Sequence, residues 1–215
     1  MSIVERKPKS IQAEAYRSLR TNIQYSSFDK EYKTLVVTSA NPGEGKTTVS
    51  SNLALVLSQG EKKILLIDCD MRRPSIHKRF RVTNTHGITD LLLGKKSIDS
   101  VINKFNNNLH IITSGKIPPN PAEMLDSKVM TKFLDAMKNE YDYIVIDTPP
   151  IQAAADAQIL STKTDGILVV VRAGETKKDI VIDSISKLKK VNANIIGTVL
   201  NGVENKNEKY YCNYE

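Results

Sequence analysis

The segment Thr38–Thr48, with the sequence TSANPGEGKTT, constrains the fold of this chain more than any other stretch. It follows an apolar run and opens a stretch with a helical pattern, so a glycine-rich turn joins a strand to a helix. The turn matches the phosphate-binding P-loop pattern, with Ala40 in the first glycine position and Gly45-Lys46-Thr47 at its end. The glycines let backbone N–H groups point inward, beside the positive end of the following helix. The segment therefore predicts a nucleotide-binding loop.

Short apolar runs alternate with helical patterns along the rest of the chain. Several of the predicted strands are apolar throughout, which is typical of a parallel sheet covered on both faces by helices. Strand–helix alternation through right-handed crossovers predicts a doubly wound, mostly parallel α/β fold of the P-loop NTPase type. The predicted strands are Thr34–Ser39, Lys63–Ile67, Leu109–Thr113, Tyr143–Ile146, Gly166–Val171 and Ile195–Leu200, and the predicted helices are 11–25, 46–59, 88–93, 127–139, 156–163 and 177–190.

A length of 215 residues suits one compact domain with a substantial core. We expect this domain to span residues 1–203, beginning with an extended arm at 1–10 and a helix at 11–25. Residues 204–215 lose all periodicity and are predicted to form a flexible tail. The apolar residues of the first predicted helix recur at four-residue spacing: Ile11, Ala15, Leu19 and Ile23.

The charge balance is basic, with 31 Lys and Arg against 24 Asp and Glu, a net charge of +7. Such a balance favours nucleotides, nucleic acid or an anionic membrane face as partners, although a merely solvated surface fits it as well. We predict no nucleic-acid binding, because the chain lacks an aromatic platform, zinc-ligand spacing and a reader motif. No apolar run approaches the ~20 residues that cross a bilayer, and the N-terminus has no signal-peptide core, so we expect a cytoplasmic location.

Two further motifs place carboxylates at the ends of apolar strands. Asp68 and Asp70 follow the run ILLI, and Asp147 follows the run YIVI. The carboxyl ends of parallel strands meet at the edge of the sheet where the P-loop also lies. One Asp after a strand is often a turn or cap residue. Three beside a P-loop can hold the water shell of Mg²⁺ and accept a proton from a nucleophile, so together they predict a Mg²⁺–ATP site.

The motifs Asp68-x-Asp70-x-Arg72 and Asp147-x-x-Pro150, combined with the P-loop, resemble the Walker A′ and Walker B motifs of bacterial protein-tyrosine kinases. The resemblance covers nearly the whole chain. It is closest to the separate cytoplasmic kinases of Gram-positive capsular and exopolysaccharide systems, and implies transfer of phosphate from ATP to protein tyrosines. It also implies two partners: a membrane activator of the polysaccharide co-polymerase type, which recruits the kinase to the inner face of the membrane, and a cognate tyrosine phosphatase.

The segment with Glu14, Arg17 and Arg20 resembles the E-x-x-R-x-x-R helix of this family. Through that helix such kinases form a ring-shaped oligomer, in which the tail of one subunit enters the active site of its neighbour. The three residues share one broad helical face. The spacing alone also fits an exposed helix with salt bridges.

The tail carries Tyr210, Tyr211 and Tyr214, in a chain with only eight tyrosines. This cluster resembles the tyrosine-rich tails that are phosphorylated in trans in the family, so the resemblance implies that these three residues are phosphoacceptors. The cluster is short and is interrupted by Cys212 and Asn213. Composition alone also fits a disordered end.

The resemblance also assigns roles within the site. Lys46 neutralises charge on the phosphates, and Thr47 ligates Mg²⁺ with Asp70, Asp147 and Asp68 around the metal. Asp68 accepts the tyrosine proton, with Asp70 as the alternative base. The residues expected to contact the nucleotide are Asn41, Pro42, Gly43, Glu44, Gly45, Lys46, Thr47, Thr48 and Arg72.

Two other functions fit part of the pattern. A partition or septum-positioning switch ATPase has a similar topology, but its K-G-G-x-G-K loop carries an early lysine where this chain has Asn41, followed by Pro42. A non-catalytic, nucleotide-dependent adaptor of a polysaccharide export complex would bind ATP and leave its tail unmodified. The intact lysine, threonine and acids of the site favour the kinase, and detection of phosphotyrosine separates the three hypotheses.

Overall fold

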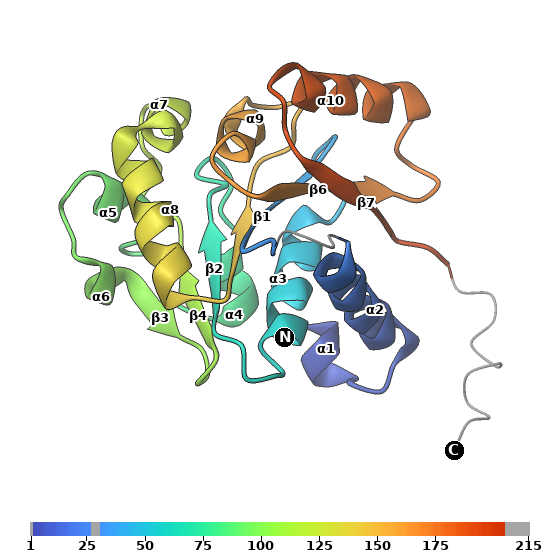
Figure 1. Ribbon diagram of the computed structural model, residues 1–215, viewed down its shortest axis with the longest axis horizontal. Helices are drawn as coiled ribbons and strands as arrows, with labels where there is room; N and C mark the ends of the chain where they lie inside the picture. The colour runs from blue at the N-terminus through green and yellow to red at the C-terminus, as the bar shows by residue number, and fades with distance from the viewer. Residues whose placement is uncertain (1, 27–30, 205–215) are drawn as a thin grey trace.

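The computed structural model describes residues 2–26 and 31–204, which form a seven-stranded sheet between two layers of helices (Figure 1). The strand order is β3-β4-β2-β5-β1-β6-β7. Only β3 runs antiparallel to its neighbour, and every other pair of strands is parallel. The predicted doubly wound, mostly parallel fold is therefore confirmed. The strands are β1 (Thr34–Ser39), β2 (Ile64–Asp68), β3 (Ile102–Lys104), β4 (Leu109–Ile112), β5 (Tyr143–Asp147), β6 (Gly166–Arg172) and β7 (Ile195–Asn201).

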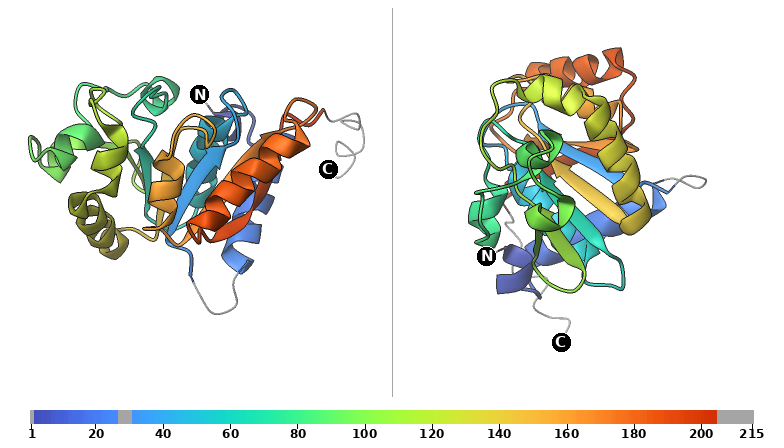
Figure 2. Two further views of the ribbon diagram at one scale, coloured as in Figure 1. Left: turned by 90° about the horizontal axis from the view of Figure 1, so that it is seen from above. Right: turned by 90° about the vertical axis from the view of Figure 1, so that its left-hand side faces the viewer.

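The helices divide between the two faces of the sheet (Figure 2). Helices α1 to α4 cover one face, and helices α5 to α10 cover the other. None of the helices in the described ranges is long and apolar enough to cross a membrane. The helices are α1 (Ile3–Arg6), α2 (Ile11–Tyr25), α3 (Lys46–Leu57), α4 (Ile76–Phe80), α5 (Ile88–Leu92), α6 (Ile98–Val101), α7 (Pro121–Asp126), α8 (Lys128–Glu140), α9 (Asp156–Ser161) and α10 (Lys178–Lys190).

The central strands are buried along their whole length, which explains why their sequences are apolar throughout. Successive side chains of a strand point to opposite faces. In β2, Leu65 and Ile67 pack in the layer of α5 to α10, whereas Ile64 and Leu66 pack in the layer of α1 to α4. Each face of the sheet therefore has its own apolar core.

Helix α3 begins directly after Gly45 of the P-loop and is deeply buried. Every residue from Val49 to Leu57 is buried, so this helix is enclosed on all sides. It contacts β1, β2 and β5 as well as α1 and α2. These contacts fix the start of α3, and with it the backbone of the loop, relative to the strand ends.

The sequence analysis predicted an extended arm at residues 1–10, but part of residues 2–10 is helical. Residues Ile3–Arg6 form α1, which opens with a capping box between Ser2 and Glu5. Val4 is buried in the core formed by α1 to α4, and its backbone N–H donates to Asn52 of α3. Capping and this apolar anchor account for the helix.

The buried face of α2 also differs from the prediction. Ala15 is exposed, whereas Ala13 and Ile23 are buried and Tyr16 and Leu19 pack against the core. An α-helix has 3.6 residues per turn, so a strict four-residue spacing drifts around its surface. The residues that contact the core, Ala13, Tyr16, Leu19 and Ile23, are three or four positions apart, which matches the helical period.

Candidate active site

The P-loop joins β1 to α3, and its shape depends on two glycines in the left-handed region. Gly43 has φ +85° and Gly45 has φ +98°, a conformation that glycine adopts without the steric cost of a side chain. Glu44 between them is buried. Its carboxylate accepts hydrogen bonds from the backbone of Asn41, at 3.0 Å, and from the hydroxyl of Thr176, at 2.7 Å. The loop is thus closed on itself and tied to the segment after β6.

A second contact holds the loop from the edge of the sheet. Asn201, the last residue of β7, donates a hydrogen bond of 2.9 Å from Nδ2 to the carbonyl of Glu44. A Cβ atom at Gly45 would lie only 2.0 Å from this Nδ2, whereas a Cβ at Gly43 would meet nothing within 4 Å. Neither Thr176 nor Asn201 carries a motif signal, and their role emerges only from the folded structure.

Substituting Gly45 with alanine is expected to distort the loop much more than the same change at Gly43. Both substitutions place a side chain at positive φ, so their difference isolates the collision with Asn201. We expect Gly45→Ala to lower the free energy of unfolding by about 1–3 kcal/mol more than Gly43→Ala. Urea denaturation measures this, and adding Asn201→Ala should recover part of the loss. Equal losses for the two glycine variants would contradict the contact.

The reactive end of the loop is joined to carboxylates from two other strand ends. The ammonium group of Lys46 lies 2.7 Å from Asp70 Oδ2 and 3.8 Å from Asp147 Oδ2. The hydroxyl of Thr47 donates a hydrogen bond of 2.7 Å to Asp147 Oδ2. The order β2-β5-β1 puts these strand ends side by side. The sequence prediction that these four residues converge agrees with this geometry.

Asp68 lies directly beside the cluster, opposite Asp147 in the β2–β5 register. It is fully buried, and its carboxylate accepts backbone hydrogen bonds from Asp70 at 3.2 Å and from Ser75 and Ile76 at 3.0 Å each. Its side chain is therefore held by the turn that leads into α4.

The burial of these charges shifts their pKa values. Burial and then the neighbouring Asp147 carboxylate raise the pKa of Asp68 to about 8. Burial also raises the pKa of Asp147, against the opposing effect of Lys46. Burial by itself lowers the pKa of Lys46, but Asp147 and Asp70 outweigh it, so the pKa of this lysine is raised. Lys46 therefore stays charged, whereas Asp68 and Asp147 are protonated more readily than free aspartates.

One oxygen in the cluster has no partner. Asp147 Oδ1 is buried and accepts no hydrogen bond from the described residues, and a buried polar atom of this kind indicates a missing water or ion. Among the described residues, no group of three or more His, Cys, Asp and Glu side chains is placed to hold a metal ion by itself. The oxygen donors beside the loop, the Thr47 hydroxyl and the carboxylates of Asp70 and Asp147, are of the type that a hard cation such as Mg²⁺ prefers.

Further polar contacts surround the loop and Arg72, and among their residues Ser75 and Asp156 were not predicted from the sequence. Ser75 donates from its hydroxyl to Thr47 Oγ1 at 3.2 Å, and Arg79 donates to Thr48 Oγ1 at 2.8 Å. Buried Asp156, the first residue of α9, accepts two hydrogen bonds from the guanidinium of Arg72, at 3.2 and 3.3 Å.

Arg72, expected at the nucleotide, is thus engaged with Asp156 in this structure. The other residues expected at the nucleotide, including Pro42, lie in the loop and in the first turn of α3. The proposed phosphoacceptors Tyr210, Tyr211 and Tyr214 lie outside the described residues.

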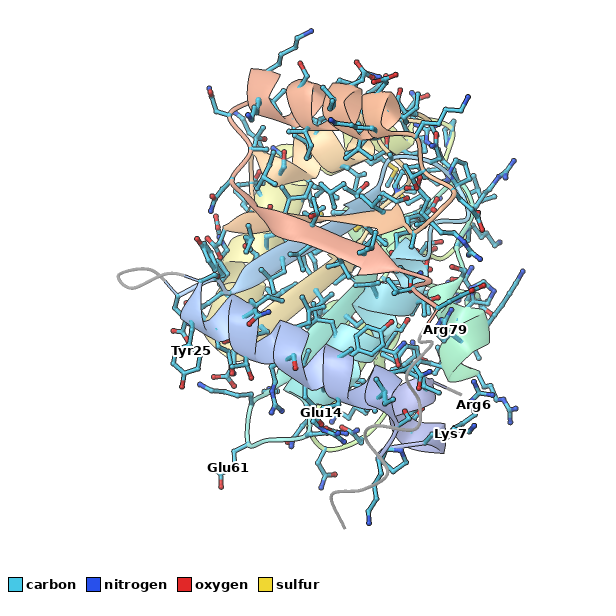
Figure 3. The ribbon with its side chains drawn as sticks, turned by 90° about the vertical axis from the view of Figure 1, so that its right-hand side faces the viewer. Arg6, Lys7, Glu14, Tyr25, Glu61 and Arg79 are labelled. Carbon is cyan, nitrogen blue, oxygen red and sulfur yellow. The ribbon has the colours of Figure 1, made fainter. Side chains whose placement is uncertain are left out.

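Helix α2 presents its motif at the surface, on the side shown in Figure 3, where Glu14 is labelled. Arg17 pairs with Glu14 at 2.8 Å and also donates to the carbonyl of Pro8. Arg20 donates to the carbonyl of Val56 at the end of α3. All three side chains therefore have partners within the chain. A cavity of about 580 Å³ lies between α2 and β7, and none of the three motif residues lines it.

Fold and site together define a P-loop nucleotide-binding protein whose loop lysine and threonine face strand-end carboxylates. Residues 32–199 match the protein family described as an AAA domain. The chain is 44% identical to tyrosine-protein kinase YwqD of Bacillus subtilis (strain 168) over 196 residues, covering 91% of this chain and 83% of YwqD. It is 39% identical to tyrosine-protein kinase CpsD of Streptococcus agalactiae over 205 residues, covering 94% of this chain and 89% of CpsD.

The kinase domain of the Escherichia coli tyrosine kinase ETK superposes with a TM-score of 0.90 and 37% identity, covering 94% of this chain and 79% of that chain. The chain belongs to the bacterial protein-tyrosine kinases, as the sequence motifs predicted. A putative plasmid partition protein from Borrelia burgdorferi fits less closely, with a TM-score of 0.65 and 27% identity. The partition proteins of the switch-ATPase alternative thus share the fold, with a lower structural similarity and a lower sequence identity to this chain.

Proposed function

We propose that this kinase transfers the γ-phosphoryl group of ATP to tyrosines in its own C-terminal tail, acting in trans, and that it regulates capsular or exopolysaccharide synthesis and export. The observation that carries the proposal is the direct link between the loop residues Lys46 and Thr47 and the carboxylates of Asp70 and Asp147. The names of the relatives, which are tyrosine-protein kinases, support the choice of acceptor.

Within the loop Asn41–Thr48, residues Gly43 to Thr48 hold the phosphates through backbone N–H groups, and Lys46 supplies positive charge where charge develops during transfer. Bound Mg²⁺ supplies further neutralisation of the phosphate charge. Thr47 is its direct ligand, and Asp70, Asp147 and Asp68 hold its water shell. The unpartnered Oδ1 of Asp147 supports this assignment.

Asp68 is the proposed base for the incoming tyrosine. A tyrosine hydroxyl has a pKa of ~10, so an ordinary aspartate is a poor acceptor for its proton. The raised pKa of Asp68, about 8 in the described structure, brings it closer to the tyrosine. Asp70, the alternative base, is instead bonded to Lys46 and to the backbone N–H of Arg73.

The remaining partners are proposed from the family resemblance. Helix α2, with Glu14, Arg17 and Arg20, forms the contact of a ring-shaped homo-oligomer. A membrane activator of the polysaccharide co-polymerase type stimulates the kinase and recruits it from the cytoplasm to the inner face of the membrane. A cognate tyrosine phosphatase removes the phosphate.

The proposal is tested by incubating the purified chain with Mg²⁺ and ATP, with and without the cytoplasmic segment of a candidate activator, and locating phosphate by mass spectrometry. We expect phosphate on Tyr210, Tyr211 or Tyr214. ATP hydrolysis without phosphotyrosine, even with activator, would instead favour the switch ATPase. ATP binding without any turnover would favour the adaptor.

Truncating the chain before Tyr210 is expected to remove autophosphorylation while ATP binding is kept. In the sequence the tail follows β7, and no residue proposed to contact the nucleotide belongs to it. The measurement compares radiolabel incorporation and nucleotide affinity of the two chains. Undiminished labelling would place the acceptors elsewhere, for example at Tyr25, which is 78% exposed at the end of α2 (labelled in Figure 3).

A further inference from the structure

A second cavity, of about 550 Å³, lies at the end of the sheet opposite the P-loop. It is bordered by α6, β3, the first residues of β4 and the end of α8. The P-loop and the catalytic carboxylates follow the carboxyl ends of the strands, whereas this cavity adjoins the start of β4 and the residue before β2. No residue assigned to phosphoryl transfer lines it.

The inner wall of this cavity is a histidine–tyrosine pair. His110 Nδ1 and the hydroxyl of Tyr141 are 2.8 Å apart, and the two rings meet edge to face. Both residues are buried, His110 with only 8% of its surface exposed. The other ring nitrogen, Nε2, has no hydrogen-bond partner among the described residues, although the side chain lines the cavity. An imidazole nitrogen without a hydrogen-bond partner, on a side chain that lines a cavity, is an available ligand-binding group.

Two lysines surround this pair without neutralising partners. Lys63 Nζ lies 4.8 Å from the centroid of the Tyr141 ring. Lys104 is directly opposite His110 in the antiparallel pairing of β3 with β4, so the two side chains share one face of the sheet. Neither lysine forms an ion pair with any residue in the described ranges. Burial, then the positive charges of Lys63 and Lys104, lower the pKa of His110.

The rest of the lining sets the character of the ligand. Ile98, Ile102 and Met137 give the cavity an apolar wall. Asp99 and Glu140 also border it, but both are exposed and neither pairs with the two lysines. Lys104 is exposed like these two acids, whereas Lys63 is half-buried, so Lys63 is the cation nearest the inner wall.

We propose that this cavity binds a phosphate monoester with an apolar body, its phosphate between Lys63, Lys104 and His110 Nε2. Two lysine charges match the roughly −2 charge of such a phosphate, and a carboxylate would use only half of them. The bound anion favours the imidazolium form of His110, in which Nδ1–H donates to the Tyr141 oxygen and Nε2–H donates to the phosphate. The apolar body packs against the isoleucines and the methionine. The site is separate from the kinase reaction and does not rest on it.

The test uses phenyl phosphate as the probe, the full chain, and Mg²⁺ with a non-hydrolysable ATP analogue to occupy the P-loop. NMR follows the imidazole Cε1–H signals. The chain has three histidines, so His77 and His86 are internal controls. We expect phenyl phosphate to shift the His110 signal and to raise its pKa by about one unit or more, because an adjacent anion stabilises the charged ring. The signals of the other two histidines stay in place.

Variants identify the groups that hold the phosphate. Lys104→Ala and Lys63→Ala are each expected to weaken phenyl phosphate about tenfold, as the loss of a charge-assisted hydrogen bond does. Lys178→Ala, which removes an exposed and unpaired lysine on α10, is the matched control and leaves affinity unchanged. A His110 signal that does not move at high probe concentration, or affinity that survives in both cavity variants, would overturn the proposal.

Two further ligands separate the sources of this chemistry. Inorganic phosphate should bind more weakly than phenyl phosphate, and equal binding would rule out the role of the apolar wall. A short phosphotyrosine peptide and glucose 1-phosphate then represent a protein and a metabolite source. Tighter binding of either supports the site and assigns its source. Failure of both to perturb His110 would refute the proposal for a phosphate monoester, whatever the kinase assay gives.

Discussion

Lys46→Met is expected to lower the rate of tyrosine phosphorylation by about a hundredfold to a thousandfold. Phosphoryl transfer depends on neutralising charge on the transferring group, and methionine keeps the length of the side chain without its charge. The lysine is already placed by Asp70 at 2.7 Å and by Asp147 at 3.8 Å. Phosphate incorporation into the tail, measured with saturating ATP, reports the effect.

The matched control for this substitution is Lys62→Met. Lys62 forms a lysine–aspartate pair with Asp142, but it lies before β2, at the end of the sheet away from the loop. This variant should phosphorylate the tail like the unmodified chain. Circular dichroism must show that the Lys46→Met variant is folded. The substitution removes the ammonium group and leaves the buried carboxylates of Asp70 and Asp147 without their cation. Full activity in a folded Lys46→Met chain would refute the assigned role.

The arrangement of the sheet could be predicted because its central strands are apolar along their entire length. β1 has the predicted bounds, Thr34–Ser39. The site followed from position alone: Asp68 and Asp147 end two strands, and the fold places the ends of parallel strands at one edge. Local sequence and global topology point to the same residues there, so no contact had to be known in advance.

Short elements escaped prediction because their local signals are weak. α4 has five residues and α6 has four, so a helical period is hard to recognise there, although α5, also of five residues, was predicted. β3 has three residues and pairs only with β4 at the edge of the sheet. Such elements depend on tertiary contacts rather than on intrinsic propensity.

The contacts that position the loop escaped prediction for a related reason. Glu44 meets Thr176, and Arg72 meets Asp156, across 132 and 84 residues of sequence. No periodicity links such distant polar residues. A buried acid can be identified as a partner of a loop residue only when the fold has brought the two together.

Asp68→Asn is expected to lower tyrosine phosphorylation by about a hundredfold to ten-thousandfold, the usual loss when a general base is removed. Asparagine matches the shape of aspartate but cannot accept the tyrosine proton. Nucleotide affinity should stay within a few fold. In the described structure Asp70 bonds to Lys46 and Asp147 bonds to Thr47, whereas Asp68 forms no hydrogen bond with either loop residue. Glu61→Gln, at an exposed acid before β2 (labelled in Figure 3), is the control. Retained phosphorylation in Asp68→Asn would shift the role of base to Asp70.

The same variant separates the chemical role of Asp68 from a structural one through the pH dependence of stability without nucleotide or metal. The pKa of Asp68 is about 8 in the fold against 3.8 for the free side chain. Between these values the folded chain holds a proton that the unfolded chain releases, so this group makes the free energy of unfolding fall as pH rises, by up to about 1.4 kcal/mol per unit. Asparagine removes that contribution. Urea denaturation from about pH 5 to about pH 8 should therefore show the unmodified chain losing stability relative to Asp68→Asn. Parallel curves would mean that Asp68 is ionised throughout and is no better a base than an ordinary aspartate.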